Sequence, residues 1–63
     1  MPIVTVQQGP RSIEAKRELI SRITDAFVDT LKVPAASVQV WIHETPPESR
    51  GKGGVLRTDA SNP

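Results

Sequence analysis

The sequence predicts an α+β fold in which one long helix connects two short parallel strands and a hairpin ends the chain. Three patterns lead to this prediction: β-branched residues at 3–6, apolar residues at helical spacing within 13–32, and alternating residues at 38–43. The order strand, long helix, strand is a β-α-β unit, in which the two strands pair in parallel. We expect residues 1–63 to form a single domain.

The first strand begins almost at the start of the chain. Ile3, Val4 and Val6 favour a strand, and Gly9 and Pro10 end it. A chain start that is paired in a sheet has a fixed position, whereas most chain termini fray.

The helix is expected over residues 13–32. Ser12 is a suitable N-cap, and Glu14 lies in the first turn, where the helix dipole favours an anion. Pro34 restricts the residue before it to extended geometry, so the helix ends before Val33. Lys16 and most other charged residues are expected on the face opposite the apolar stripe. The stripe itself comprises Leu19, Ile20, Ile23, Ala26, Phe27, Thr30 and Leu31.

The second strand has a period of two. Val38, Val40 and Ile42 alternate with Gln39, Trp41 and His43, so the two sets face opposite ways. After Pro46 and Pro47, the glycine-rich residues 51–54 and the pair Val55 and Leu56 predict a tight turn with a short third strand or hairpin. Residues 57–63 are polar and predict a mobile tail.

The short chain needs support from outside its own core. A domain of 63 residues buries too little surface to be more than marginally stable. It has no Cys, which excludes disulfides, and the lone His43 cannot build a metal site, so no metal is expected. One helix covers only one face of the sheet, and parallel sheets are normally buried on both faces. We therefore expect a closed homo-oligomer whose other copies cover the face that carries Trp41.

Charge and hydropathy exclude two classes of partner. Eight basic residues against seven acidic ones give a net charge of +1, and the basic residues are scattered, which argues against nucleic-acid binding. No apolar stretch is long enough to span a membrane, and the chain start lacks the features of a signal peptide. The sequence therefore predicts a cytoplasmic protein with no membrane association.

Pro2 is the candidate catalytic base. Removal of Met1 would expose a secondary amine on a rigid ring. An α-amino group titrates near roughly 7.7 to 8.0, and desolvation or a neighbouring cation lowers its pKa further, so the amine is a usable base at neutral pH. Taken alone, the dipeptide is explained as well by a proline at the start of an edge strand.

The whole pattern resembles the 4-oxalocrotonate tautomerase family. Its most specific parts are Pro2 directly after Met1, Arg11 and Ser12 at the helix start, and the glycine-rich residues 51–54 ahead of Val55. The resemblance covers nearly the whole chain, although the stretch before Arg11 is one residue shorter than usual.

The resemblance implies a β-α-β tautomerase fold that assembles as a hexamer, a trimer of dimers. It also implies a cofactor-independent isomerase for a small carboxylate substrate, an enol or an unsaturated 2-keto acid. Pro2 matches the proline that moves the proton. Arg11 matches an arginine that binds the carboxylate and stabilises charge on the carbonyl oxygen.

Two positions depart from the family pattern. Gln39 stands where the family has a second arginine, and Arg50 stands where it has an aromatic side chain. We hypothesise that Arg50 supplies the missing cation and that Trp41, on the face of Gln39, supplies the aromatic wall. The alternatives are an exposed loop charge for Arg50 and packing between subunits for Trp41.

Two other functions stay open at this point. The altered pocket is compatible with hydrolytic dehalogenation or hydration of an unsaturated acid, in which the proline acts as an acid. A non-catalytic subunit of a mixed hexamer, completed by an arginine from a different chain, is the second alternative.

Overall fold

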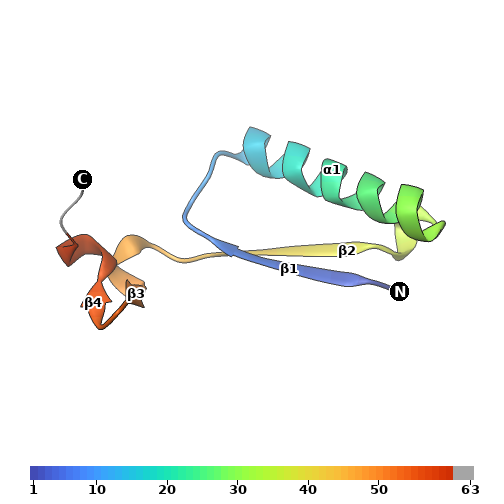
Figure 1. Ribbon diagram of the computed structural model, residues 1–63. Helices are drawn as coiled ribbons and strands as arrows, with labels where there is room; N and C mark the ends of the chain where they lie inside the picture. The colour runs from blue at the N-terminus through green and yellow to red at the C-terminus, as the bar shows by residue number, and fades with distance from the viewer. Residues whose placement is uncertain (61–63) are drawn as a thin grey trace.

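The computed structural model describes residues 1–60 and contains the predicted β-α-β unit (Figure 1). Strand β1 (Ile3–Gln8) leads into helix α1 (Ile13–Leu31), which returns the chain to strand β2 (Gln39–Glu44). The short strands β3 (Gly51–Lys52) and β4 (Val55–Leu56) follow. Short 3-10 turns that the sequence analysis did not predict lie at Ala35–Ser37, Pro47–Ser49 and Arg57–Asp59.

The two long strands form a parallel pair under the helix. The register runs from Ile3 opposite Gln39 to Gln8 opposite Glu44. Helix α1 lies across one face of the pair (Figure 1), and Val4 and Val6 of β1 are half-buried while Ile3, Thr5 and Gln7 are exposed. In β2, for which alternation was predicted, Val40 and Ile42 are half-buried and Trp41 and His43 are exposed, whereas Gln39 is half-buried.

Helix α1 has the predicted cap at its start and ends one residue earlier than predicted. The Ser12 hydroxyl accepts a hydrogen bond from the backbone N–H of Ala15 at 3.1 Å. At the other end, Lys32 adopts left-handed geometry, with φ 58° and ψ 41°, while its N–H donates to the carbonyl of Val28. This left-handed residue ends the helix two positions before Pro34.

The half-buried stripe of α1 differs in part from the predicted one. Leu19, Ile23 and Phe27 are half-buried as expected. The other four residues of the predicted stripe are exposed: Ile20, Ala26, Thr30 and Leu31. Lys16 was expected on the solvent face, and this prediction is wrong. Its position, three residues before Leu19 and seven before Ile23, continues the half-buried stripe by one turn. The full half-buried set is Lys16, Leu19, Ile23, Thr24, Phe27 and Val28.

The predicted hairpin is present after β2. Strands β3 and β4 pair antiparallel, with Lys52 opposite Val55. Gly53 and Gly54 between them have φ values of 61° and 84°. Two consecutive positive φ angles are what the tight hairpin turn with the right twist requires, and glycine adopts them without steric cost. Of the predicted mobile tail, residues 57–59 form a 3-10 turn, and residues 61–63 lie outside the described residues.

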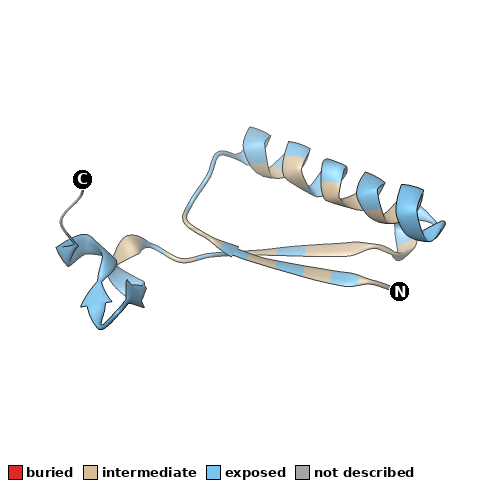
Figure 2. Cartoon of the chain, in the orientation of Figure 1, coloured by how far each residue is buried: buried red, intermediate tan, exposed pale blue. Residues whose placement is uncertain are grey.

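No residue among 1–60 is buried, so the isolated chain has no core of its own (Figure 2). Ile3 is 61% exposed and Trp41 54% exposed on the sheet face opposite α1. The molecule is elongated, with extents of 44 × 23 × 19 Å, because the hairpin projects beyond the β-α-β unit (Figure 1). Within the described residues, no helix has the length and apolar character needed to cross a membrane.

Candidate active site

Pro2 lies beside Gln39 at the end of the sheet where both long strands begin. The carbonyl of Pro2 accepts a hydrogen bond from the backbone N–H of Gln39 at 3.0 Å. Pro2 is half-buried, whereas Met1 before it is 86% exposed. The strand pairing therefore fixes the position of Pro2 and leaves Met1 in solvent.

Trp41 orients the side chain of Gln39. The two residues share the open sheet face, and the indole Nε1 donates to Gln39 Oε1 at 3.3 Å. An indole N–H can only donate, so the amide oxygen is the atom that faces it. The amide nitrogen of Gln39, with its two donors, is left for another acceptor. We call Pro2, Gln39 and Trp41 the strand-start cluster.

Arg11 lies at the opposite end of β1, just before the helix. Its backbone N–H donates to Glu44 Oε2 at 2.9 Å, and Lys16 Nζ contacts the other carboxylate oxygen at 3.0 Å. These donors hold the pKa of Glu44 below its ordinary value, the Arg11 N–H contributing most and Lys16 next. Among residues 1–60, the Arg11 guanidinium forms no ion pair.

Arg50 packs against the loop that leads to Arg11. A Cβ atom placed on Gly9 would lie 3.1 Å from both terminal nitrogens of the Arg50 guanidinium. Glycine at position 9 therefore leaves the space that the guanidinium occupies. We call Arg11, Arg50, Glu44 and Lys16 the helix-start cluster.

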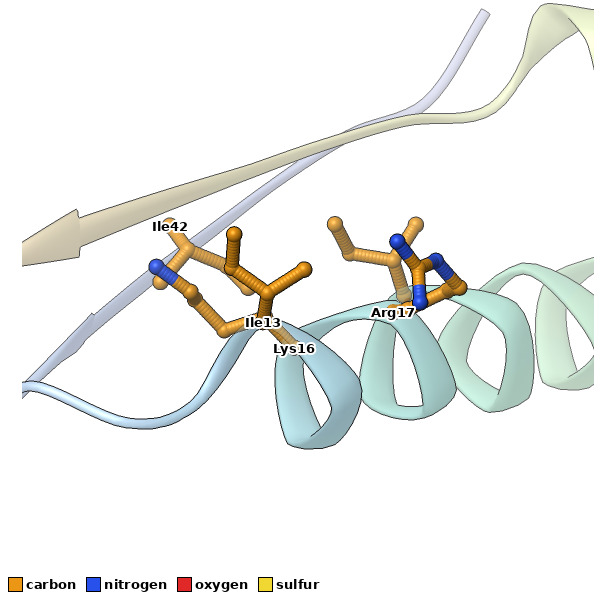
Figure 3. A pocket seen from close by; sticks show the side chains of 5 residues that line it. Ile13, Lys16, Arg17 and Ile42 are labelled. Carbon is orange, nitrogen blue, oxygen red and sulfur yellow. The ribbon is translucent and has the colours of Figure 1, made fainter.

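A shallow groove between α1 and β2 adjoins this cluster (Figure 3). Its cationic side chains come from Lys16 and Arg17, and its apolar side chains come from Ile13, Ile20 and Ile42. The groove therefore combines positive charge with an apolar wall at the helix-start end of the molecule.

A single chain does not bring the predicted site residues together. Strand β1 spans six residues, from Ile3 to Gln8. At a rise of about 3.3 Å per residue, this strand separates Pro2 from the loop of Arg11 by roughly 20 Å. Figure 1 shows the chain start at one end of the sheet and the start of α1 at the other. The strand-start cluster and the helix-start cluster can therefore act on one substrate only if they come from different copies.

Glu44 and Lys16 lie beside Arg11, although neither was among the site residues predicted from the sequence. Glu44 ends β2 opposite Gln8, which brings it to the loop before the helix. For Lys16 a signal was present, since it continues the spacing of Leu19 and Ile23. Within residues 1–60, no three His, Cys, Asp or Glu side chains gather in a way that could hold a metal ion.

Comparison with known proteins gives consistent matches along the whole chain. The model of the family described as tautomerase enzyme matches residues 2–60. A 2-hydroxymuconate tautomerase of Comamonas testosteroni is 44% identical over 45 residues, which cover 71% of each chain. A probable tautomerase of Ralstonia nicotianae is 43% identical over 100% of this chain and 91% of its own length. The crystal structure of a 4-oxalocrotonate tautomerase homologue superposes with a TM-score of 0.88 at 32% identity, covering 98% of this chain and 100% of its own.

Proposed function

Because the chain belongs to the tautomerase enzyme family, and is therefore an isomerase, we propose that it is a cofactor-independent tautomerase in which Pro2 moves the proton. The proposed substrate is a small enol or unsaturated 2-keto acid that carries a carboxylate. The observation that carries this proposal is the family match over residues 2–60, which begins at the proposed base.

Pro2 takes the role of general base once Met1 is removed. Pro2 is a small residue of the kind that permits removal of the Met1 before it. The free secondary amine accepts a proton from the enol hydroxyl or from a carbon next to the carbonyl, and the electron pair left behind forms a dienolate. The proline ammonium then returns the proton to a different carbon. The proton count is unchanged, and no oxidant, reductant or cofactor is needed.

Arg11 binds the substrate carboxylate in this proposal. Its guanidinium has no ionic partner among residues 1–60, so it is available to form two parallel hydrogen bonds with a carboxylate. Placed near the carbonyl, the same positive charge stabilises the dienolate oxygen. The position of Arg50 against Gly9, two residues before Arg11, supports a second cation for the substrate.

Gln39 and Trp41 form the wall of the proposed pocket opposite the arginines. The free amide N–H groups of Gln39 donate to a carbonyl or carboxylate oxygen without adding charge. Trp41 is 54% exposed beside it and offers an apolar surface to the unsaturated carbon chain. In this proposal the arginines supply the positive charge of the pocket, and the strand-start cluster determines its shape.

Two copies build one site in this proposal. The roughly 20 Å between the clusters requires that Arg11 and Arg50 of one copy reach Pro2 of another. The absence of any buried residue among 1–60 supports an obligate assembly. The homo-hexamer and the cytoplasmic location stay predictions.

The test begins with the mass of the purified protein and its activity on an enol. We expect a mass without Met1, and we expect Pro2→Ala to lower kcat by at least about a hundredfold, the usual contribution of a positioned base. Full activity of Pro2→Ala, or an active protein that retains Met1, would contradict the proposal. A halo-acrylate assayed in parallel tests dehalogenation, and activity of this chain alone excludes a need for a different subunit.

A further inference from the structure

Glu44 holds the chain at Arg11 through two separate contacts. Its Oε2 accepts the Arg11 backbone N–H at 2.9 Å, and its Oε1 contacts Lys16 Nζ at 3.0 Å. Each oxygen of the Glu44 carboxylate binds one donor, and the two donors lie on either side of Ser12 in the chain. These two contacts fix the orientation of the carboxylate. The side chains of Glu44 and Lys16 are only 27% and 28% exposed, so these contacts are partly shielded from solvent.

The contact ties the loop before the helix to the rigid sheet. Glu44 is paired in register with Gln8, and the next residue, Thr45, donates its N–H to the Gln8 carbonyl at 3.0 Å. The start of the loop and the acceptor of the Arg11 N–H are therefore fixed to the same end of the sheet. Only Gly9 and Pro10 lie between Gln8 and Arg11 in the chain, and these two residues form no helix or strand.

The arrangement also leaves the charge of Arg11 uncompensated. Glu44 binds the backbone of Arg11, not its guanidinium, and the negative charge of Glu44 is balanced by Lys16. Without Lys16, the charge of this carboxylate would be unbalanced, and a side chain that binds the Arg11 backbone would compete with a substrate for the Arg11 guanidinium. Lys16 thus keeps Glu44 from acting as an internal competitor.

We propose that Glu44 is a positioning residue for Arg11: its carboxylate fixes the Arg11 backbone, and Lys16 balances its charge, so that the guanidinium is held free for a substrate carboxylate. This inference rests on the proposed function, because it assigns Glu44 a role only if Arg11 binds substrate. Glu44 itself does not touch the substrate.

The test uses the full-length oligomer and an enol that carries a carboxylate. We expect Glu44→Ala to raise KM about tenfold, since a misplaced binding group loses much of its effect, with kcat within about twofold. Glu44→Gln keeps an oxygen acceptor for the Arg11 N–H and should stay within about threefold of the wild-type KM. The methyl ester of the same enol should give the same KM in the wild type and in both variants.

Ser12→Ala is the matched control for a loosened helix start. It removes the cap bond to Ala15 but leaves the Arg11 N–H in place, so it should lower Tm without raising KM. An equal rise of KM in Ser12→Ala would show that Glu44 acts only through helix stability and would overturn the inference. If Glu44→Ala does not fold, Glu44→Asp, whose carboxylate is one methylene shorter, decides by the same KM comparison.

Arg11→Ala separates the two proposals. A raised KM in Arg11→Ala with an unchanged KM in the Glu44 variants overturns the inference and leaves the proposed function standing. An unchanged KM in Arg11→Ala overturns the role of Arg11 and the inference together. In the double variant Arg11→Ala with Glu44→Ala, we expect KM to be no higher than in Arg11→Ala alone. The reason is that Glu44 affects substrate binding only by positioning Arg11.

Discussion

At the scale of single residues, the proposed site has the neutral amide of Gln39 in one place and the positive charge of Arg11 and Arg50 in another. Gln39 cannot replace an arginine's charge, but Trp41 fixes its amide so that the nitrogen is the free end. Arg50 lies against the loop before Arg11, far along the sheet from Gln39 of the same chain. Recognition of a second carboxylate would therefore depend on how the copies assemble.

Arg50→Ala tests whether this side chain binds substrate. We expect KM for a diacid to rise about ten- to a hundredfold, the loss typical of one charge-assisted hydrogen bond, while KM for a monoacid stays unchanged. Steady-state kinetics with the two substrates measures the difference. Adding Gln39→Arg to this variant should restore diacid binding. If Arg50→Ala changes neither KM, Arg50 is an exposed loop charge without a role in binding.

At the scale of the elements, the end of α1 carries a conformational cost. Lys32 is the one non-glycine residue with positive φ among residues 1–60. Left-handed geometry costs a residue with a Cβ atom about 1 kcal/mol, which glycine does not pay. We expect Lys32→Gly to raise the free energy of unfolding by up to about 1 kcal/mol in a urea titration. Lys32→Ala removes the charge but keeps the Cβ atom, so an equal gain there would contradict this explanation.

The contact between β2 and α1 should make stability depend on pH. The Arg11 N–H and Lys16 lower the pKa of Glu44 in the folded state. A lowered folded-state pKa stabilises the protein above the unfolded-state pKa, and this contribution is lost as the pH falls through the folded value. We therefore expect Tm of the wild type to exceed that of Glu44→Gln above about pH 5 and the difference to vanish in stronger acid.

Thermal unfolding of the two proteins by circular dichroism between about pH 3 and pH 8 checks this expectation. Effects of acid on assembly are common to both proteins and cancel in the difference. A Tm difference that is constant across this range, or that grows in acid, would show that Glu44 stabilises the fold by packing and not through its charge.

At the scale of the whole molecule, sequence patterns predicted the elements better than their meeting points. β-Branched residues predicted β1, helical spacing predicted α1, period two predicted β2, and the glycines predicted the hairpin. The inward position of Lys16 was missed because a charge was assigned to solvent, although Glu44 from a distant strand compensates it. The meeting of Glu44 with the loop before Arg11 depends on strand direction and register, which local patterns do not encode.

The absence of a buried core in the single chain is the physical reason for the proposed assembly. Burial of apolar surface is the main stabilising contribution to folding, and residues 1–60 of the isolated chain bury no side chain fully. Exposed apolar residues lie on the open sheet face at Ile3 and Trp41 and on the hairpin at Val55 and Leu56. In the proposed homo-oligomer, other copies cover these surfaces and so give the chain a core.

Stability should therefore fall on dilution. For an obligate oligomer, each tenfold dilution lowers the free energy of unfolding by roughly 1 kcal/mol per chain, because assembly and folding are linked. We expect Tm from circular dichroism to decrease steadily between about 100 and about 1 μM protein, with dissociation seen by analytical ultracentrifugation at the low end. The control is Glu18→Gln, which breaks an exposed ion pair with Arg22 and should leave the slope unchanged. A Tm independent of concentration would mean that the chain folds alone, and a site shared between two copies would then lose its main physical support.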